Sequence, residues 1–137
     1  MHTMMETLLS SMKEKGVGTI VNVGANIQGS LASIELAKKY PFMYAAVGIH
    51  PSDCGQMNQN DLKSLEDMAQ YEKVVAIGEI GLDYYWPEPD RLIQKEWFVK
   101  QLELAKKLHK PVIIHSRDAA KDTMDILKEY VGRLNNV

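Results

Sequence analysis

The sequence has a single cysteine, no long apolar run and no excess of charge of one sign. With Cys54 alone the chain forms no internal disulfide, which is typical of proteins in a reducing compartment. No apolar run approaches the roughly 20 residues that a membrane-spanning helix needs. The N-terminal residues Met1–Glu6 lack the basic start and apolar core of a signal peptide. We therefore expect a cytoplasmic protein with no membrane partner.

Neither sign of charge dominates the chain, whose formal net charge is −2. The sequence lacks the global positive field of proteins that bind nucleic acid by charge alone. A nucleic-acid substrate is still compatible with this charge, because a bound metal ion supplies positive charge locally. Hydrophobic residues make up 45% of the chain and charged residues 25%. Because there is also no repeat, low-complexity segment or linker, we expect one domain over residues 1–137.

Short apolar runs alternate with stretches in which apolar residues recur at helical spacing. The runs predict strands at Thr19–Val23, Met43–Ile49, Val74–Ile77 and Val112–Ile114. The spaced stretches predict helices around Leu8–Met12, Leu31–Ala37, Leu62–Met68, Arg91–Leu108 and Asp118–Tyr130. Strands separated by helices of this length pair in parallel, so the fold class is α/β.

About four strands are too few to close a parallel barrel, which takes eight strands and roughly 250 residues. The pattern therefore predicts either a small open α/β sheet or a partial (β/α) TIM-type barrel. In both architectures functional residues gather at the carboxyl ends of the strands. The polar residues that follow the predicted strands are Asn22, Asn26, His50, Glu79, Asp83, His115 and Arg117.

Glu79 and His115 occupy equivalent positions after two successive strands. A carboxylate and an imidazole at neighbouring strand ends can reach one ion, and their donor atoms suit Mg²⁺, Mn²⁺ or Zn²⁺. We therefore predict that Glu79 and His115 are metal ligands. Taken singly, Glu79 could instead cap the next segment or bind a loop amide, and His115 could be a packed, hydrogen-bonded residue.

Three further residues have two interpretations each. His50, before Pro51, is either a support or phosphate contact of the metal site or a structural turn residue. Asp83 is either an acceptor that supports the site or a loop cap. Arg117 either clamps a phosphate with its planar guanidinium or pairs with an acid of the last helix.

The remaining candidates are weaker. The aromatic run Tyr84–Trp86 could stack on nucleobases, although packing under the long helix is the favoured interpretation. His109 is expected at an exposed helix end, and His2 in a frayed terminus. Cys54 has no basic neighbour in sequence and is given no catalytic role.

The blocks Gly48–Pro51, Gly78–Tyr85 and Pro111–Ala119 resemble successive signature blocks of the TatD family of metal-dependent hydrolases. Between the last two, the segment Gln94–Ala105 is also similar to the family pattern. The resemblance extends from about Leu8 to Tyr130, with the blocks in order and at family-like spacing.

The resemblance implies an amidohydrolase-like barrel and a Mg²⁺-dependent deoxyribonuclease, often a 3′-to-5′ exonuclease. Some family members are linked to removal of D-amino acids from tRNA. By position, Glu79 resembles the glutamate that bridges two metals and His115 resembles a histidine ligand of one of them. His50 and Arg117 fall in motif positions near the site.

The sequence also departs from the family pattern. The family's first strand ends in His-x-His, which His2–Met4 does not reproduce. A later histidine and an aspartate in a Thr-Asp-x-Pro context are expected beyond Val137. By this comparison two of the expected metal-site residues are present and four are missing, and the chain is expected to be the N-terminal half of a barrel without its first strand.

These comparisons lead to two main hypotheses. The first is a metal-dependent hydrolase acting on DNA or another phosphodiester, with a second copy or a complementing chain covering the half barrel. The alternative is an inactive barrel fragment that keeps the fold and at most weak metal binding. A third interpretation is a small α/β binding domain unrelated to hydrolysis.

Overall fold

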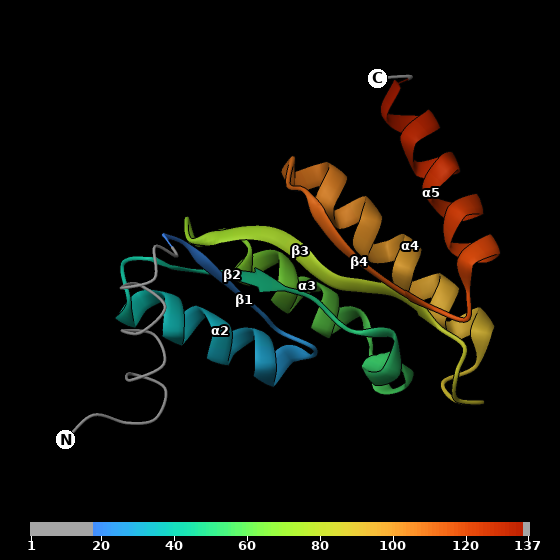
Figure 1. The fold of residues 1–137 in the computed structure, drawn as a ribbon, viewed down its shortest axis with the longest axis horizontal. Helices are drawn as coiled ribbons and strands as arrows, with labels where there is room; N and C mark the ends of the chain where they lie inside the picture. The colour runs from blue at the N-terminus through green and yellow to red at the C-terminus, as the bar shows by residue number, and fades with distance from the viewer. Residues whose placement is uncertain (1–17, 136–137) are drawn as a thin grey trace.

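The computed structural model describes residues 18–135, which form one parallel sheet with helices against it (Figure 1). The sheet has four strands in the order β1-β2-β3-β4, each parallel to its neighbour. Their bounds are β1 Ile20–Val23, β2 Met43–Val47, β3 Val74–Asp83 and β4 Val112–Arg117. The predicted helix around Leu8–Met12 lies outside the described residues.

The helices connect successive strands, as the alternating pattern predicts. Their bounds are α2 Ile27–Lys39, α3 Gln59–Met68, α4 Arg91–Leu108 and α5 Ala120–Asn135, and a 3₁₀ helix, η1, covers Pro51–Gln56. Side chains fix several of the helix starts. Asn26 caps α2 by accepting from the Gly29 amide, and Asn58 and Asp61 form a capping box at α3. His109 ends α4 in the left-handed conformation and is exposed, as predicted.

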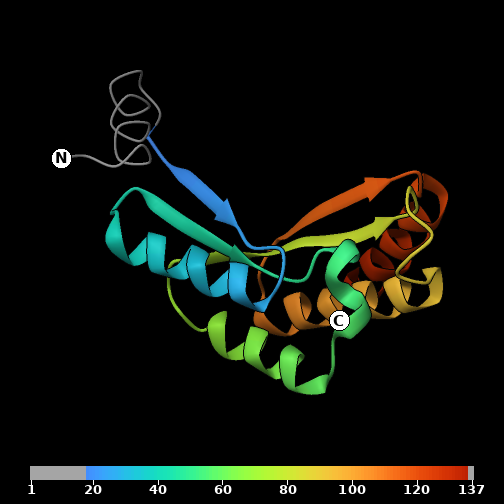
Figure 2. The same cartoon turned by 90° about the horizontal axis from the view of Figure 1, so that it is seen from below.

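The helices α2, α3 and α4 all lie against one face of the sheet (Figure 2). The main core is there, and it includes Phe98 and Leu102 of α4 with Ile77, Ile80 and Leu82 of β3. No described helix covers the opposite face, which we call the open face. Its residues alternate with the core residues and include Val21, Val23, Ala76, Gly81 and Ile113. Val21 and Val23 are 40% and 37% exposed.

Two strands are longer than the apolar runs predict. β3 continues from Ile77 to Asp83, and β4 continues from Ile114 to Arg117. The expectation that Glu79, Asp83, His115 and Arg117 follow the strands is therefore wrong, since all four lie within them. Ile80 and Leu82 keep packing into the core while the polar residues face away, so the ladder persists through a polar and glycine-rich segment. The 3₁₀ helix η1 begins directly after His50, in a segment for which the apolar pattern predicts no element.

Candidate metal centre

A bulge in β3 places its two carboxylates on the open face. Gly78 pairs with Ile113 of β4 and Ile80 pairs with Ile114, so Glu79 is an extra residue in β3. An extra residue re-aims the side chains that follow it. Ile80 and Leu82 therefore point into the core. Glu79 and Asp83 point the other way, toward β4's polar end.

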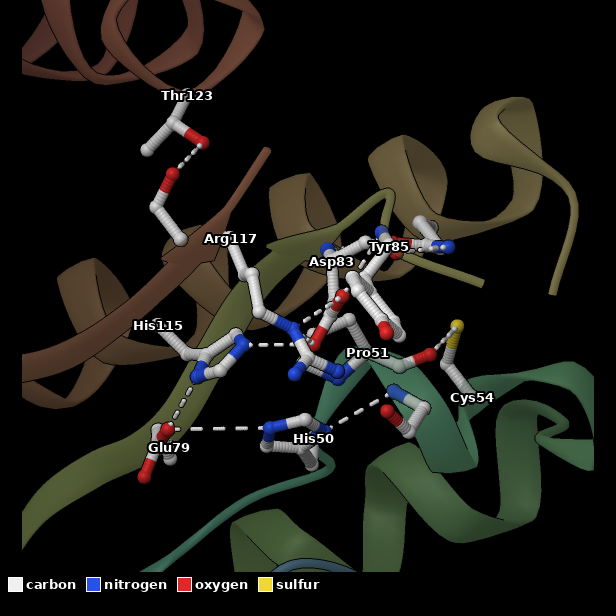
Figure 3. Close-up of polar contacts among 12 residues, drawn as sticks. His50, Pro51, Cys54, Glu79, Asp83, Tyr85, His115, Arg117 and Thr123 are labelled. Carbon is white, nitrogen blue, oxygen red and sulfur yellow. Dashed lines mark hydrogen bonds and ion pairs between the residues drawn. The ribbon is translucent and has the colours of Figure 1, made fainter. Parts of the chain in front are cut away.

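His115 joins the two carboxylates. It pairs with Gly81, which lies midway between Glu79 and Asp83 along β3. Its ring Nδ1 lies 2.7 Å from Glu79 Oε1, and its Nε2 lies 2.9 Å from Asp83 Oδ2 (Figure 3). The close pairing needs glycine at position 81, because a Cβ there would lie 1.9 Å from the His115 carbonyl oxygen. The imidazole is thus fixed at both nitrogens.

The two carboxylates differ in environment. The Asp83 side chain is 3% exposed, whereas that of Glu79 is 36% exposed. Both Asp83 oxygens lie 3.1 Å from Arg117 Nε, and Oδ1 also accepts from the Tyr85 amide. Burial raises the pKa of Asp83, but the hydrogen bonds from Arg117, His115 and the Tyr85 amide outweigh burial and leave that pKa below its usual value. Asp83 is therefore charged and its acceptor positions are engaged.

His50 reaches the same cluster from β2. Its Nδ1 accepts from the Ser52 amide at 3.0 Å and caps η1. Its Nε2 lies 3.8 Å from Glu79 Oε1, and its ring centroid lies 4.3 Å from that of His115. Burial and the neighbouring His115 lower the pKa of His50, with Glu79 acting in the opposite direction. The turn interpretation and the site interpretation thus both apply to this residue.

Two buried glutamines of α4 hold the strand ends from behind the sheet. Gln94 accepts from the Asp83 amide at 2.8 Å and donates to the Asp83 carbonyl at 3.0 Å. Gln101 does the same for Ile49, the residue before His50, at 2.8 and 3.2 Å. Neither glutamine has a role predicted from the sequence. Their signal was two polar residues spaced by about two helical turns on an otherwise apolar face.

The clustered donor atoms suit a divalent ion. One donor atom each of His50, Asp83 and His115 lies within 4.8 Å of the other two. Glu79 Oε1 lies at the opposite nitrogen of the His115 ring, and 3.8 Å from His50 Nε2. Nitrogen from two histidines and oxygen from a carboxylate are ligands that Zn²⁺ and Mn²⁺ accept, and Mg²⁺ takes the carboxylate oxygens. The residues present therefore fit a metal ion.

Other candidates lie apart from this cluster. Asn26 is occupied as a helix cap, and Asn22 shares the helix-covered side of β1 with Ile20. The Cys54 thiol donates to the Pro51 carbonyl, and burial raises its pKa to about 11, so it is protonated at neutral pH. The acid that pairs with Arg117 is Asp83, and not an acid of the last helix.

The aromatic run divides into two parts. Tyr84 packs against the core as predicted and donates to Asp122 of α5 at 2.7 Å. The expectation of packing is wrong for Tyr85 and Trp86, which are 56% and 58% exposed. The peptide that carries Tyr85 is held at the strand end by Asp83, so its side chain extends over Arg117 instead of under α4.

This half barrel, with imidazoles and carboxylates at its strand ends, has the architecture of a metal-dependent hydrolase. Residues 1–135 match the family described as TatD related DNase. The chain therefore belongs to the TatD family, which excludes an unrelated small α/β domain.

Individual relatives agree with this assignment. The chain is 43% identical over 127 residues to the uncharacterized metal-dependent hydrolase YabD of Bacillus subtilis, covering 93% of this chain and 50% of the relative. It is 32% identical over 128 residues to the 3′-5′ ssDNA/RNA exonuclease TatD of Edwardsiella piscicida, covering 93% and 49%. The chain spans about half the length of the curated relatives it matches.

A solved structure shows which larger fold the sheet belongs to. The crystal structure of YJJV, a TatD homologue from Escherichia coli K12, superposes with a TM-score of 0.85 at 33% identity, over 92% of this chain and 49% of YJJV. The four-stranded sheet is therefore part of a (β/α) barrel and not a complete open sheet. Within residues 18–135, no helix is both long and apolar enough to cross a bilayer.

Proposed function

We propose that this chain carries one side of the active site of a metal-dependent hydrolase that cleaves phosphodiester bonds in DNA. The single observation that carries the proposal is the position of His115 between Glu79 and Asp83, with His50 beside it. The Edwardsiella relative is named as a 3′-5′ ssDNA/RNA exonuclease, which supports nucleic acid as the substrate class. The cytoplasm is the proposed location, supported by the single unpaired Cys54.

The residues divide into ligands and supports. Glu79 and His115 are the proposed ligands, and His50 joins them because its Nδ1 is held by the Ser52 amide while Nε2 faces Glu79. Asp83 belongs to the same cluster of donor atoms, but we assign it the orientation of His115 and Arg117, because Arg117 and the Tyr85 amide also engage its oxygens. A divalent ion bound here, with Mg²⁺, Mn²⁺ and Zn²⁺ as candidates, would supply a Lewis acid and a water of lowered pKa.

Arg117 is the proposed phosphate contact. Its Nε is held by Asp83 while the side chain remains 46% exposed at the strand end. A guanidinium oriented in this way can present its remaining donors to a phosphate oxygen. The structure thus supports a phosphate contact for Arg117 in addition to its ion pair with Asp83.

We further propose that the open face is covered in the active protein, either by a second copy or by a chain segment that carries the other strands. Within residues 18–135 no strand pairs with the outer edge of β1 or β4, and two valines of β1 are exposed, which supports this because open edges and apolar faces promote association. Sedimentation at micromolar concentration should show an assembly larger than a monomer. A clean monomer across the concentration range would contradict association between copies.

Metal titration tests the ligand assignment. We expect the chain to bind Mn²⁺ or Zn²⁺, and Glu79→Gln to weaken binding by about 100-fold or more, because a proposed ligand is lost. Asp83→Asn should weaken it less, by roughly 10-fold, through loss of orientation. Glu35→Gln is the matched control, since the Glu35 side chain is 73% exposed and pairs with Lys38 on α2. Equal affinities for wild type and Glu79→Gln would refute the assignment.

Hydrolysis of a single-stranded oligonucleotide with Mg²⁺ or Mn²⁺ tests the reaction. Activity that disappears in Glu79→Ala and with a chelator would support the proposal, whereas activity unaffected by Glu79→Ala would indicate a contaminant. Metal binding without hydrolysis, alone or in the presence of a complementing chain, would favour the inactive-fragment alternative.

A further inference from the structure

The rim of the metal centre carries exposed aromatic side chains that the proposed ligands do not explain. Tyr85 and Trp86 follow β3 after Tyr84 and are 56% and 58% exposed. Their rings meet edge to face, with centroids 4.8 Å apart at 83°. Large aromatic side chains exposed together at a strand end cost solvation without stabilising a core. Tyr85 and Trp86 are called the aromatic rim below.

The aromatic rim is tied to the metal centre through Asp83. Oδ1 of Asp83 accepts from the Tyr85 amide at 3.1 Å and also contacts Arg117 Nε at 3.1 Å. The Arg117 guanidinium in turn lies over the Tyr85 ring, 4.4 Å from its centroid. Asp83 therefore fixes both the cation and the backbone that carries the rings (Figure 3). The rim is held at a defined position next to the centre.

Cationic and acidic side chains both occur on or beside the loop that carries the rim. Arg117 lies over Tyr85, and Arg91 lies over the ring of the preceding Tyr84 at 4.2 Å. An open, polar hollow of about 430 Å³ near the end of the same loop is lined by Glu88 and by residues of η1 that include Asp53. A phosphodiester backbone would be repelled by those acids and attracted by the guanidiniums. Alternating aromatic and cationic groups are the usual arrangement for binding single strands.

We propose that the aromatic rim is a base-stacking platform, on which Trp86, backed by Tyr85, stacks on a nucleobase of single-stranded nucleic acid while Arg117 receives the adjacent phosphate. This rests on the proposed phosphodiesterase function and assigns the substrate's orientation at that same site. Because stacking requires only a flat ring, the platform accepts any base and needs an unpaired strand.

The two tryptophans make the proposal directly measurable. Trp97 is 6% exposed in the core, whereas Trp86 is 58% exposed, so a ligand that stacks quenches Trp86 emission alone. The wild-type chain is titrated in EDTA with pentathymidylate and with an abasic oligomer of the same length and charge. We expect quenching by pentathymidylate only, and affinity for it about 5-fold to 150-fold higher than for the abasic oligomer.

Variants separate stacking from general binding. With a labelled pentathymidylate and anisotropy as the readout, Trp86→Ala should weaken binding by about 5-fold or more, and Trp86→Phe should retain most of the affinity. Leu92→Ala is the matched control, because Leu92 is a 73% exposed apolar residue near the start of α4. Three results would overturn the platform: equal affinity for the abasic and thymidylate oligomers, an affinity of Trp86→Ala equal to that of the wild type, or no binding at millimolar concentration.

The outcomes also distinguish this proposal from the one on which it rests. If metal binding depends on Glu79 but the thymidylate and abasic oligomers bind equally, the stacking platform is refuted and the metal-dependent function stands. If pentathymidylate quenches Trp86 but the chain binds no metal, the platform stands and the metal-dependent function is refuted.

Discussion

The two faces of the same sheet differ in what their residues do. On the helix-covered face, β3 contributes Ile77, Ile80 and Leu82, all fully buried against α4. On the open face, the same strand contributes Glu79 and Asp83, which hold His115. Side chains of one strand, one residue apart, thus serve folding on one side and chemistry on the other.

The difference between the faces predicts how much a substitution on each should lower the free energy of unfolding. Buried apolar area stabilises the fold by roughly 25 cal/mol per Å², so the helix-covered face carries most of the folding free energy. The ionic contacts of the open face are partly exposed and contribute less. Gln94 and Gln101 combine both roles. Their side chains are buried in the core, and they hydrogen-bond the backbone of Asp83 and of Ile49, the residue before His50.

The largest effect is expected in the core. Phe98→Ala should lower the free energy of unfolding by about 3–5 kcal/mol, because it removes a 1% exposed side chain and leaves a cavity. Val23→Thr, a substitution of similar shape on the open face, should change it by about 0.5 kcal/mol or less. Urea unfolding measures both. Similar losses for the two variants would show that the open face is packed as tightly as the core.

An intermediate effect is expected at the glutamine behind β3. Gln94→Leu keeps an apolar side chain of similar size but leaves the buried amide and carbonyl of Asp83 without their partner, at a cost of about 2–3 kcal/mol. It should also weaken metal binding, because the strand end is released. Lys106→Leu, at a partly exposed position of α4, is the control. If Gln94→Leu lowers the free energy of unfolding but leaves the metal affinity unaltered, Gln94 stabilises the fold without positioning the site.

The smallest effect is expected for the buried carboxylate, and it depends on pH. The pKa of Asp83 is lowered in the folded chain, so its stabilisation is present above the unfolded pKa, near 3.8, and is lost as the pH falls through the lower folded value. Asp83→Asn in a chelator should therefore cost about 1 kcal/mol at pH 7, discounted for the exposed Arg117. That difference should vanish toward pH 2. A difference independent of pH would refute a charged Asp83.

Periodicity was sufficient to predict the order and type of the described elements. The predicted bounds of α4, Arg91–Leu108, are those of the structure. The site residues were found because strand ends gather polar side chains, and the structure brings His50, Glu79, Asp83, His115 and Arg117 together. Their roles as ligands or supports remain predictions.

The remaining features depend on partners that are distant in sequence. The bulge at Glu79 is defined by its pairing with β4, more than 30 residues later. Gln101 contacts Ile49 at a separation of 52 residues. The position of the Tyr85 ring depends on Arg117, more than 30 residues later, whose guanidinium lies over it. Composition and periodicity describe a segment's own preference and carry no information on such pairings.

The extra residue at Glu79 makes the count of residues in β3 matter as much as their identity. If β3 kept all its residues but paired with β4 without this bulge, side chains would simply alternate from Ile77 onward. Glu79 and Asp83 would then be turned toward α4, and Ile80 and Leu82 toward the open face, so a regular strand would be inverted even with every residue type kept. Related sequences should accordingly vary in length elsewhere before they vary here.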